Sequence, residues 1–243
     1  MFLAIDIGNS HVVCAIHDAN KWIHKIRISS NLEFWDQFIT LREYDITHAA
    51  ISSVVPCMTS VYIESVRNIF HIDTFIINYE NAGIGLEVDS PKEVGVDRIC
   101  NTAAAKKMTG CPAIIGDIGS ATNYDVVDEK GSFIGGAIAP GPEIAAKNLF
   151  EKAALLKETT FTVPTLAIGT DTSTNLQSGI MLGAIDVIDG MFSRIQSESG
   201  WKNPHNIITG GFGELISPHL KTEHTFLPTL TLDGIWIIYE KVA

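Results

Sequence analysis

Hydrophobic and polar residues follow one another along positions 2–28 in a pattern typical of β-strands. Two mainly apolar stretches, FLAIDIG at 2–8 and HVVCAIHD at 11–18, precede a third, alternating stretch at 22–28. Consecutive strands joined by short polar turns pair as antiparallel neighbours. The opening of the chain therefore predicts a small antiparallel meander.

The chain beyond this opening alternates between helical and strand patterns. Helices are expected at 31–41 and 60–70, and strands at 48–55 (HAAISSVV) and 73–80 (DTFIINYE). Apolar residues recur about every 3.6 residues in a helix and every 2 residues in a strand, which distinguishes the two kinds of element. Alternation of this kind favours an α/β fold.

The opening pattern recurs in the middle of the chain, in CPAIIGDIGSATNYDVVDEKGSFIGGAIAPG at 111–141. A shift of 111 positions places Asp6 on Asp117, Ile7 on Ile118, Gly8 on Gly119 and Asn9 on Ser120. A repeated strand–turn–strand device predicts two similar domains that face each other. We place them at 1–111 and 112–243, packed closely because no Ser-rich or Pro-rich linker separates them.

Asp6 and Asp117 each end a predicted buried strand. A carboxylate there is costly unless backbone donors or a cation satisfy it. Gly8 and Gly119 lack a side chain where the chain turns, so backbone amides can approach a phosphate closely. An ordinary hairpin turn would explain one such motif, but the repetition favours a phosphate and metal cradle between two lobes. Polar side chains follow at Asn9, Ser10 and Ser120.

Composition narrows the class of protein. The formal net charge of -11 leaves no basic surface for nucleic acid or an anionic membrane. No segment approaches the roughly 20 apolar residues of a membrane span. The four cysteines form no C-x-x-C pair and the eight histidines show no paired spacing, so neither a zinc site nor a disulfide framework is expected. We expect a soluble cytoplasmic protein with reduced thiols.

VGVDRICNTAAAKKMTG at 94–110 predicts a helix after Val96, with Asp97 and Arg98 at or before its first turn. Asp97 could simply cap this helix. Equally, a carboxylate there can accept the proton of a substrate hydroxyl while Arg98 holds an anionic or polar group. The residues alone leave both interpretations open.

Three later segments carry similar alternatives. GGAIAPG at 135–141 has the small residues expected where backbone passes close to a ligand or another segment, or it forms a Gly-Pro loop without a ligand. TGGFG at 209–213 follows an apolar strand pattern and could admit a nucleotide or be a plain strand-to-helix turn. Thr172 precedes a long helical pattern that holds Gly179 and Gly183, and by position alone it predicts a helix cap.

The motifs together resemble a known family. D-I-G-N-S and D-I-G-S-A look like the two phosphate motifs of the acetate and sugar kinase, heat-shock chaperone and actin superfamily. With SPKEVGVDR at 90–98, GGAIAPG, IGTDT and LQSG within 168–179, and TGGFG, nearly the whole chain resembles type III pantothenate kinase. The resemblance implies two ribonuclease-H-like domains, each a mixed five-stranded sheet flanked by helices, with the active site in the cleft. No G-x-x-x-x-G-K-[ST] is present, which excludes a P-loop kinase.

The resemblance also implies an activity: ATP-dependent phosphorylation of pantothenate to 4'-phosphopantothenate, the first step of coenzyme A biosynthesis. Asp97 would be the general base, and Gly95, Val96, Arg98 and Thr172 would bind pantothenate with it. Magnesium, a monovalent cation (K⁺ or NH₄⁺) and a homodimeric assembly are implied as well.

Further roles follow from the same resemblance. Asp117 would hold the monovalent cation, and Asp6 would hold magnesium through water. At Val88 the family usually carries an aromatic residue that helps to enclose pantothenate, which points to weaker substrate affinity here. The ATP site would be formed by Asp6, Ile7, Gly8, Asn9, Ser10, His11, Val12, Val13 and Ser120.

Two other functions stay open. A sugar or carboxylate kinase of the same superfamily would share the phosphate motifs but not the V-G-V-D-R segment. A regulatory or binding protein could keep the fold without activity, although such a protein has no need of a general base. A panel of substrates would separate the three.

Overall fold

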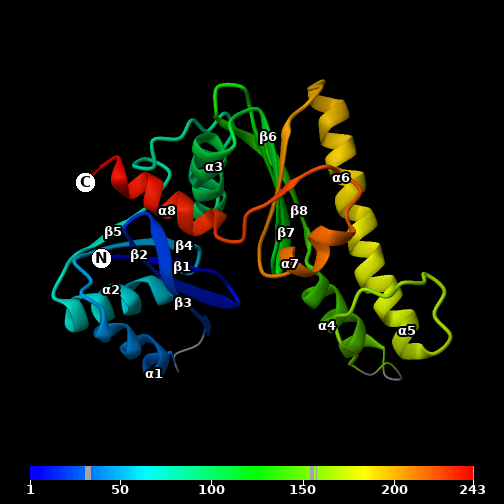
Figure 1. Ribbon diagram of the computed structural model, residues 1–243, viewed down its shortest axis with the longest axis horizontal. Coiled ribbons are helices and arrows are strands. Elements are labelled where there is room, and N and C mark those ends of the chain that lie inside the picture. The colour runs from blue at the N-terminus through cyan, green and yellow to red at the C-terminus, as the bar shows by residue number, and fades with distance from the viewer. Residues whose placement is uncertain (31–33, 154–155, 157, 243) are drawn as a thin grey trace. The chain divides into compact units, whose positions relative to one another are not determined.

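The computed structural model describes residues 1–30, 34–153, 156 and 158–242 (Figure 1). Its contacts divide the chain into two compact units, one formed by Met1–Met108 with Leu230–Ala243 and the other by Thr109–Thr229. Each unit is built on one five-stranded mixed sheet. Among the described residues, no helix has the length and apolar character needed to cross a membrane.

The sheet of the first unit has the order β3-β2-β1-β4-β5. β1 pairs antiparallel with β2, and β2 with β3, which confirms the predicted meander. On its other side β1 pairs parallel with β4, and β4 with β5. The strands are β1 (Phe2–Ile7), β2 (His11–Asp18), β3 (Lys21–Ser29), β4 (His48–Ser53) and β5 (Thr74–Ile76).

β5 is shorter than the strand predicted at 73–80. The Asn78 side chain accepts hydrogen bonds from the backbone N–H groups of Glu80 and Asn81, at 2.8 and 3.0 Å. An asparagine that bonds the backbone ahead of it forms a turn in place of a strand. The predicted strand therefore ends early.

The helices of the first unit are α1 (Trp35–Phe38), α2 (Pro56–Phe70), α3 (Val96–Met108) and α8 (Leu230–Glu240), with 3₁₀ turns η1 (Ile39–Glu43) and η2 (Pro91–Glu93). The helix predicted at 31–41 begins in residues 31–33, which lie outside the described residues. Its described part is one short α-helix followed by the 3₁₀ turn. α2 begins at Pro56, ahead of the predicted start at residue 60, because proline is well suited to the first turn of a helix.

The second unit repeats the topology of the first. Its sheet has the order β10-β9-β6-β7-β8, so its first strand again lies between its second and its fourth. β1 and β6 share one burial pattern, in which Asp6 and Asp117 are half-buried between buried neighbours. The predicted duplication is confirmed by this match. The strands are β6 (Ala113–Ile118), β7 (Ala121–Val127), β8 (Phe133–Pro140), β9 (His205–Thr209) and β10 (Thr225–Phe226).

One helical segment dominates the second unit. α5 (Thr172–Gln177), the π-helical η3 (Ser178–Leu182) and α6 (Gly183–Ser199) follow one another without a break. The unit also holds α4 (Pro142–Lys152), α7 (Gly213–Ile216) and η4 (Ser217–His219). Most of GGAIAPG lies in β8, so this motif is mainly strand and only its last glycine, Gly141, is a loop residue that caps α4.

The two units differ from the expected ranges 1–111 and 112–243, because residues 109–111 lie in the second unit and Leu230–Ala243 lie in the first. α8 packs along α3 in the first unit (Figure 1). Leu232, Ile235 and Ile238 are buried there in one cluster with β1 residues. A Cβ at Gly234 would run into the backbone of Cys100, so α8 and α3 are in close contact. The reason is burial: an apolar helix covers an apolar sheet face that would otherwise meet water.

Candidate active site

The turn between β1 and β2 is closed by its own backbone. The Gly8 N–H donates to the His11 carbonyl oxygen at 3.0 Å. Ser30 holds the turn from outside, because its Oγ donates to the Gly8 carbonyl oxygen at 2.7 Å and its N–H to the Ser10 carbonyl oxygen at 2.9 Å. Asn9 at the tip is exposed. The turn is thus a fixed loop with polar groups at its tip, the kind of geometry that binds an anion.

The side chains beside this turn divide into core and surface. Ile7 and Val12 are fully buried, so they can offer a ligand only backbone atoms. Val13 and His11 are half-buried. Arg27 on β3 donates from Nη2 to Nδ1 of His11 over 3.1 Å, which fixes the His11 ring and places a cation beside the turn.

The Asp6 carboxylate is anchored from the neighbouring parallel strand. Asp6 pairs in register with Ser52 on β4. The Ser52 Oγ donates to Asp6 Oδ1 at 3.0 Å. A half-buried carboxylate at a strand end is therefore partly satisfied by a hydroxyl group that lies 46 residues away in sequence.

Asp97 lies in the first turn of α3. Its Oδ1 accepts a hydrogen bond from the Arg98 N–H at 2.9 Å, and the Gly95 carbonyl oxygen accepts from the N–H groups of Arg98 and Ile99. A Cβ at Gly95 would lie 2.5 Å from Asp97 Oδ1, so only glycine leaves room for this carboxylate. Burial raises the pKa of Asp97, and the Arg98 N–H and charge offset part of this effect. A carboxylate of raised pKa is suited to accepting a proton.

The turn between β6 and β7 is shorter than its counterpart in the first unit. The Gly119 N–H donates to the Ala121 carbonyl oxygen at 2.9 Å, whereas Gly8 reaches one residue further to His11. Asp6 pairs with Val13, but Asp117 pairs with Asn123. The two copies therefore agree up to the glycine, and one residue is missing after it.

Two distant glycines close around this shorter turn. The Gly141 N–H donates to the Ser120 carbonyl oxygen at 3.0 Å, and a Cβ at position 141 would run into the carbonyl oxygens of Gly119 and Ser120. A Cβ at Gly210, whose φ is +89°, would lie 2.5 Å from Asp117 Oδ1. The motifs D-I-G-S-A, GGAIAPG and TGGFG thus meet in one bare-backbone cradle beside the Asp117 carboxylate.

Thr172 is not a helix cap, contrary to the expectation from its position alone. The N-cap of α5 is Asp171, whose Oδ1 accepts from the Thr174 N–H at 2.9 Å in a capping box. Thr172 is the exposed first residue of the helix. Asp171 takes the cap because its carboxylate accepts the hydrogen bond and favours the positive end of the helix dipole.

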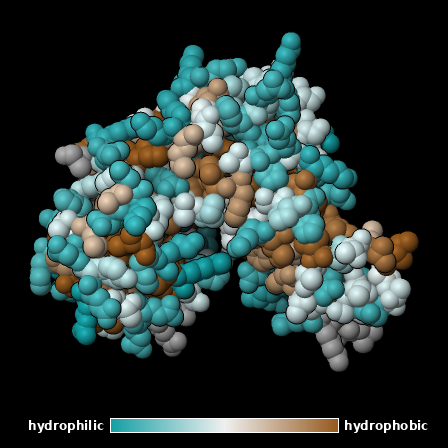
Figure 2. All heavy atoms as spheres, viewed as in Figure 1, coloured by the Kyte–Doolittle hydropathy of each residue, from teal (hydrophilic) through white to brown (hydrophobic). Residues whose placement is uncertain are grey.

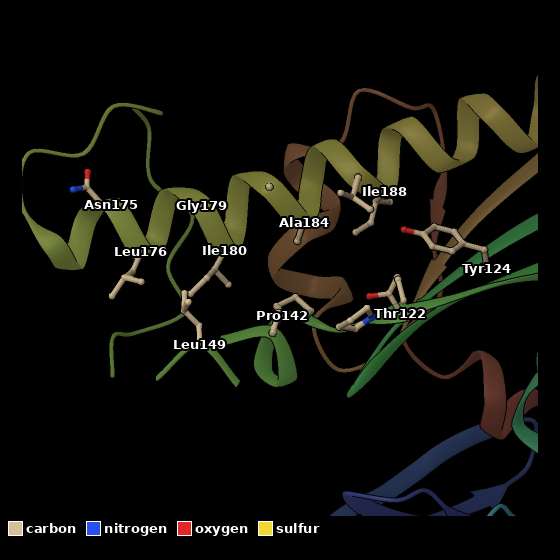
Figure 3. A pocket seen from close by; sticks show the side chains of 15 residues that line it. Thr122, Tyr124, Pro142, Leu149, Asn175, Leu176, Gly179, Ile180, Ala184 and Ile188 are labelled. Atoms are coloured by element: carbon tan, nitrogen blue, oxygen red, sulfur yellow. The ribbon is translucent and has the colours of Figure 1, made fainter. Parts of the chain in front are cut away.

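A mainly apolar groove of about 570 Å³ lies between α4 and the continuous segment α5–η3–α6 (Figure 3). Leu176, Ile180 and Ala184 point into it from the helical segment, while Thr122 and Tyr124 face it from β7. The π-helical turn η3 forms part of the groove wall through Gly179 and Ile180. π-helical turns occur frequently at functional sites, so the groove is a candidate binding surface.

A family model described as type III pantothenate kinase matches residues 2–194. A curated type III pantothenate kinase from Thermomicrobium roseum is 36% identical over 254 aligned residues, covering 100% of this chain and 98% of the relative. The chain belongs to the type III pantothenate kinase family.

Solved structures share the fold of this family member. A conserved Campylobacter jejuni protein assigned to the Baf family of transcriptional activators matches with a TM-score of 0.64 and 19% identity, over 99% of this chain and 98% of that one. MreB5 of Spiroplasma citri bound to ADP matches with a TM-score of 0.51 and 10% identity, over 99% and 96%. At these identities the likeness concerns the fold alone, and it agrees with the expected fold of two mixed five-stranded sheets flanked by helices.

The site residues that the family resemblance predicts for this chain lie in two groups, one in each unit. In the first unit, Asp6 and Asp97 both lie within electrostatic reach of the Cys100 thiol. In the second unit, Asp117 and Ser120 lie beside Gly141 and Gly210. Val88 is half-buried in the segment that leads to η2.

Several residues of the site were not predicted. Ser30 and Arg27 hold the first turn, and Ser52 holds Asp6. Ser52 carried a signal that could have found it, because a polar residue near the end of an apolar strand was the reason for selecting Asp6. Ser30 and Arg27 carried none, since polar residues are ordinary in an exposed strand and its end.

Proposed function

We propose that this chain phosphorylates pantothenate with ATP, giving 4'-phosphopantothenate in the first step of coenzyme A biosynthesis, with Asp97 as the general base. Family membership supports the activity. The observation that carries the role of Asp97 is its partly buried carboxylate, whose pKa is raised, on the first turn of α3 beside Arg98. Phosphoryl transfer needs little covalent chemistry from the protein, so positioning and charge neutralisation supply most of the catalysis.

The turn after β1 is our candidate for the triphosphate. The backbone around Gly8 and the polar groups of Asn9 and Ser10 would hold phosphate oxygens, with Ile7, Val12 and Val13 contributing backbone atoms and His11 its ring. Within the described chain, no group of three or more His, Cys, Asp or Glu side chains is placed to hold a metal ion. Asp6 alone nevertheless fits magnesium, which usually takes one or two carboxylates and completes its shell with phosphate and water oxygens. When bound, the ion would neutralise phosphate charge.

The cradle after β6 is our candidate for the monovalent cation and for part of the nucleotide. The support for this assignment is the room left by the two glycines, because Cβ atoms at Gly141 and Gly210 would fill the region around Ser120 and the Asp117 carboxylate. Asp117 would balance the charge of K⁺ or NH₄⁺, and Ser120 would offer a hydroxyl group to ATP.

The acceptor site would be formed around α3. Asp97 would take the proton of the pantothenate primary hydroxyl as the phosphoryl group transfers to it. Arg98 would bind a polar or anionic group of the substrate, with Gly95, Val96 and Thr172 as further contacts. Val88 presents a smaller apolar surface than an aromatic side chain, so we expect pantothenate to bind weakly.

We also propose that the protein is a cytoplasmic homodimer. The apolar groove of the second unit is lined in part by exposed apolar side chains, among them Val187 at 53% and Leu149 at 41% exposure. Leu166 and Ile168, at 72% and 85%, lie in the segment before α5, where Figure 2 shows hydrophobic side chains at the surface. Contiguous apolar surface of this kind is typical of protein–protein interfaces. A second copy of this chain is the occupant that the family resemblance implies.

The deciding experiment is a substrate panel with the purified protein. With ATP, Mg²⁺, K⁺ and pantothenate up to high concentration, we expect ADP release and formation of phosphopantothenate. Sugars and acetate should release no more ADP than a blank. If a sugar or acetate is phosphorylated and pantothenate is not, the chain is a different kinase of the superfamily. If nothing is phosphorylated, the binding-protein alternative replaces the proposal.

A further inference from the structure

Ser52 is a fully buried hydroxyl residue near the end of β4, where it follows three buried apolar residues. Its Oγ donates to Asp6 Oδ1 at 3.0 Å, across a pair of parallel strands that hold the two residues in register. A buried hydroxyl group is costly unless it is hydrogen-bonded, and a bond to a carboxylate is among the stronger kinds. This one hydrogen bond therefore gives the buried hydroxyl group of Ser52 its partner and restrains the Asp6 carboxylate.

Ser52 has one hydroxyl proton, and the bond to Asp6 uses it. Because the side chain of Ser52 is fully buried, no water competes for this proton. The contact between the hydroxyl group and the carboxylate is therefore direct and protected from solvent.

The second unit repeats this juxtaposition. Thr209, at the end of β9, pairs in register with Asp117 as Ser52 pairs with Asp6. Thr209 is also buried, with 2% of its surface exposed. A hydroxyl residue stands beside the carboxylate in both copies, and at the matched positions of these strands Ala49 and Ala50 are replaced by Asn206 and Ile207. Recurrence at one register position points to a role for the hydroxyl group with the carboxylate.

We infer that Ser52 is a positioning residue that fixes the Asp6 carboxylate for binding of the magnesium nucleotide. This rests on the proposed role of Asp6. Fixing Oδ1 restricts rotation of the carboxylate about its Cβ–Cγ bond, so the charge is already oriented when the nucleotide arrives.

The primary test compares Ser52→Ala with Ser65→Ala. Ser65 is a matched control, because it is buried in the same unit and its Oγ donates to the Val61 carbonyl oxygen at 2.8 Å, a local helix contact. We expect Ser52→Ala to raise the dissociation constant of Mg-ADP, measured by titration calorimetry, and the KM for Mg-ATP by on the order of tenfold to a hundredfold. The KM for pantothenate should stay at the wild-type value. Ser65→Ala should change none of these.

A second pair of variants separates positioning from packing. Ser52→Thr, which copies Thr209, keeps the hydroxyl group and should recover much of the binding lost in Ser52→Ala. Ser52→Val has nearly the shape of the threonine variant without the hydroxyl group and should bind Mg-ADP less tightly than Ser52→Thr. If Ser52→Ala does not fold, this pair decides. Wild-type affinity in Ser52→Ala, or equal affinity in Ser52→Thr and Ser52→Val, would overturn the inference.

The calorimetric measurement uses Mg-ADP alone and does not depend on the acceptor. If the wild type binds Mg-ADP but does not phosphorylate pantothenate, the proposed substrate is wrong and the Ser52 comparison still decides this inference. If Ser52→Ala binds Mg-ADP normally while the wild type turns over pantothenate, the kinase assignment stands and the role of Ser52 is wrong.

Discussion

Gly95→Ala tests whether the position of the Asp97 carboxylate controls turnover. Gly95 precedes α3, and a Cβ there would lie 2.5 Å from Asp97 Oδ1. Ordinary contacts to a Cβ begin near 3.4 Å. The carboxylate must therefore move by about 1 Å. It can do so because it is the free end of a side chain, so the fold should survive while the base loses its place.

The magnitude follows from two separate effects. A displacement of about 1 Å in a reacting group can lower turnover by on the order of a hundredfold. The stability cost is small, because alanine in place of glycine at the N-cap and a strained Asp97 rotamer each cost about 1 kcal/mol. For a chain of this size we expect the thermal midpoint to fall by roughly 2–8 °C in total.

The assay measures ADP release against pantothenate, together with Mg-ADP affinity and thermal unfolding. We expect kcat to fall while Mg-ADP affinity stays at the wild-type value. Gly190→Ala is the control, because Gly190 lies in α6 with nothing within 4 Å of its added Cβ. A wild-type kcat in a folded Gly95→Ala protein would refute the argument that Asp97 acts from its observed position.

Further outcomes concern Asp97, the monovalent cation and the proposed dimer. Asp97→Asn should lower kcat by a hundredfold or more, on the order expected for a general base, while Mg-ADP affinity is retained. The folded-state pKa of Asp97 is raised, so ionisation of this carboxyl group destabilises the fold at neutral pH. Asp97→Asn should therefore raise the thermal midpoint at neutral pH. Below about pH 4, where Asp97 is protonated in the folded and unfolded states alike, the variant should no longer be more stable than the wild type. The wild-type kcat should fall on the acid side as Asp97 is protonated, and a flat pH profile would contradict this. Activity should require K⁺ or NH₄⁺, with little turnover in Na⁺; full activity without either ion would remove the Asp117 assignment. Val187→Asp in the groove should turn the proposed dimer into a monomer by light scattering, since a charge would be buried at the interface.

Local sequence was sufficient to predict the strands that carry the two carboxylates. β1, β2 and the matching β6, β7 have patterns fixed by neighbouring residues, because alternation decides which face of a strand is buried. Asp6 and Asp117 stood out as polar residues at the ends of apolar strands. The same rule applied to β4 would have selected the pair Ser52 and Ser53, and only the register with β1 shows that Ser52 is the one beside Asp6.

Adjacent polar residues were harder to distinguish. Asp171 and Thr172 both favour a helix start, and the sequence pattern does not say which side chain reaches the Thr174 N–H. The backbone angles at the entry to α5 decide this, and they depend on how the preceding segment packs. Local sequence patterns therefore predict the end of a helix only to within about one residue.

Other features depended on contacts between segments far apart in sequence. Gly141 and Gly210 close on the Asp117 turn, and the need for glycine at each is visible only once the opposing backbone is in place. α8 follows the second unit in sequence, yet it packs on α3 in the first unit because its apolar face covers the first sheet. The sequence by itself determined the repeated strands and their carboxylates, since strand patterning is local. Tertiary structure alone decided which distant groups enclose those carboxylates, because close approach and burial belong to pairs of segments and not to either one.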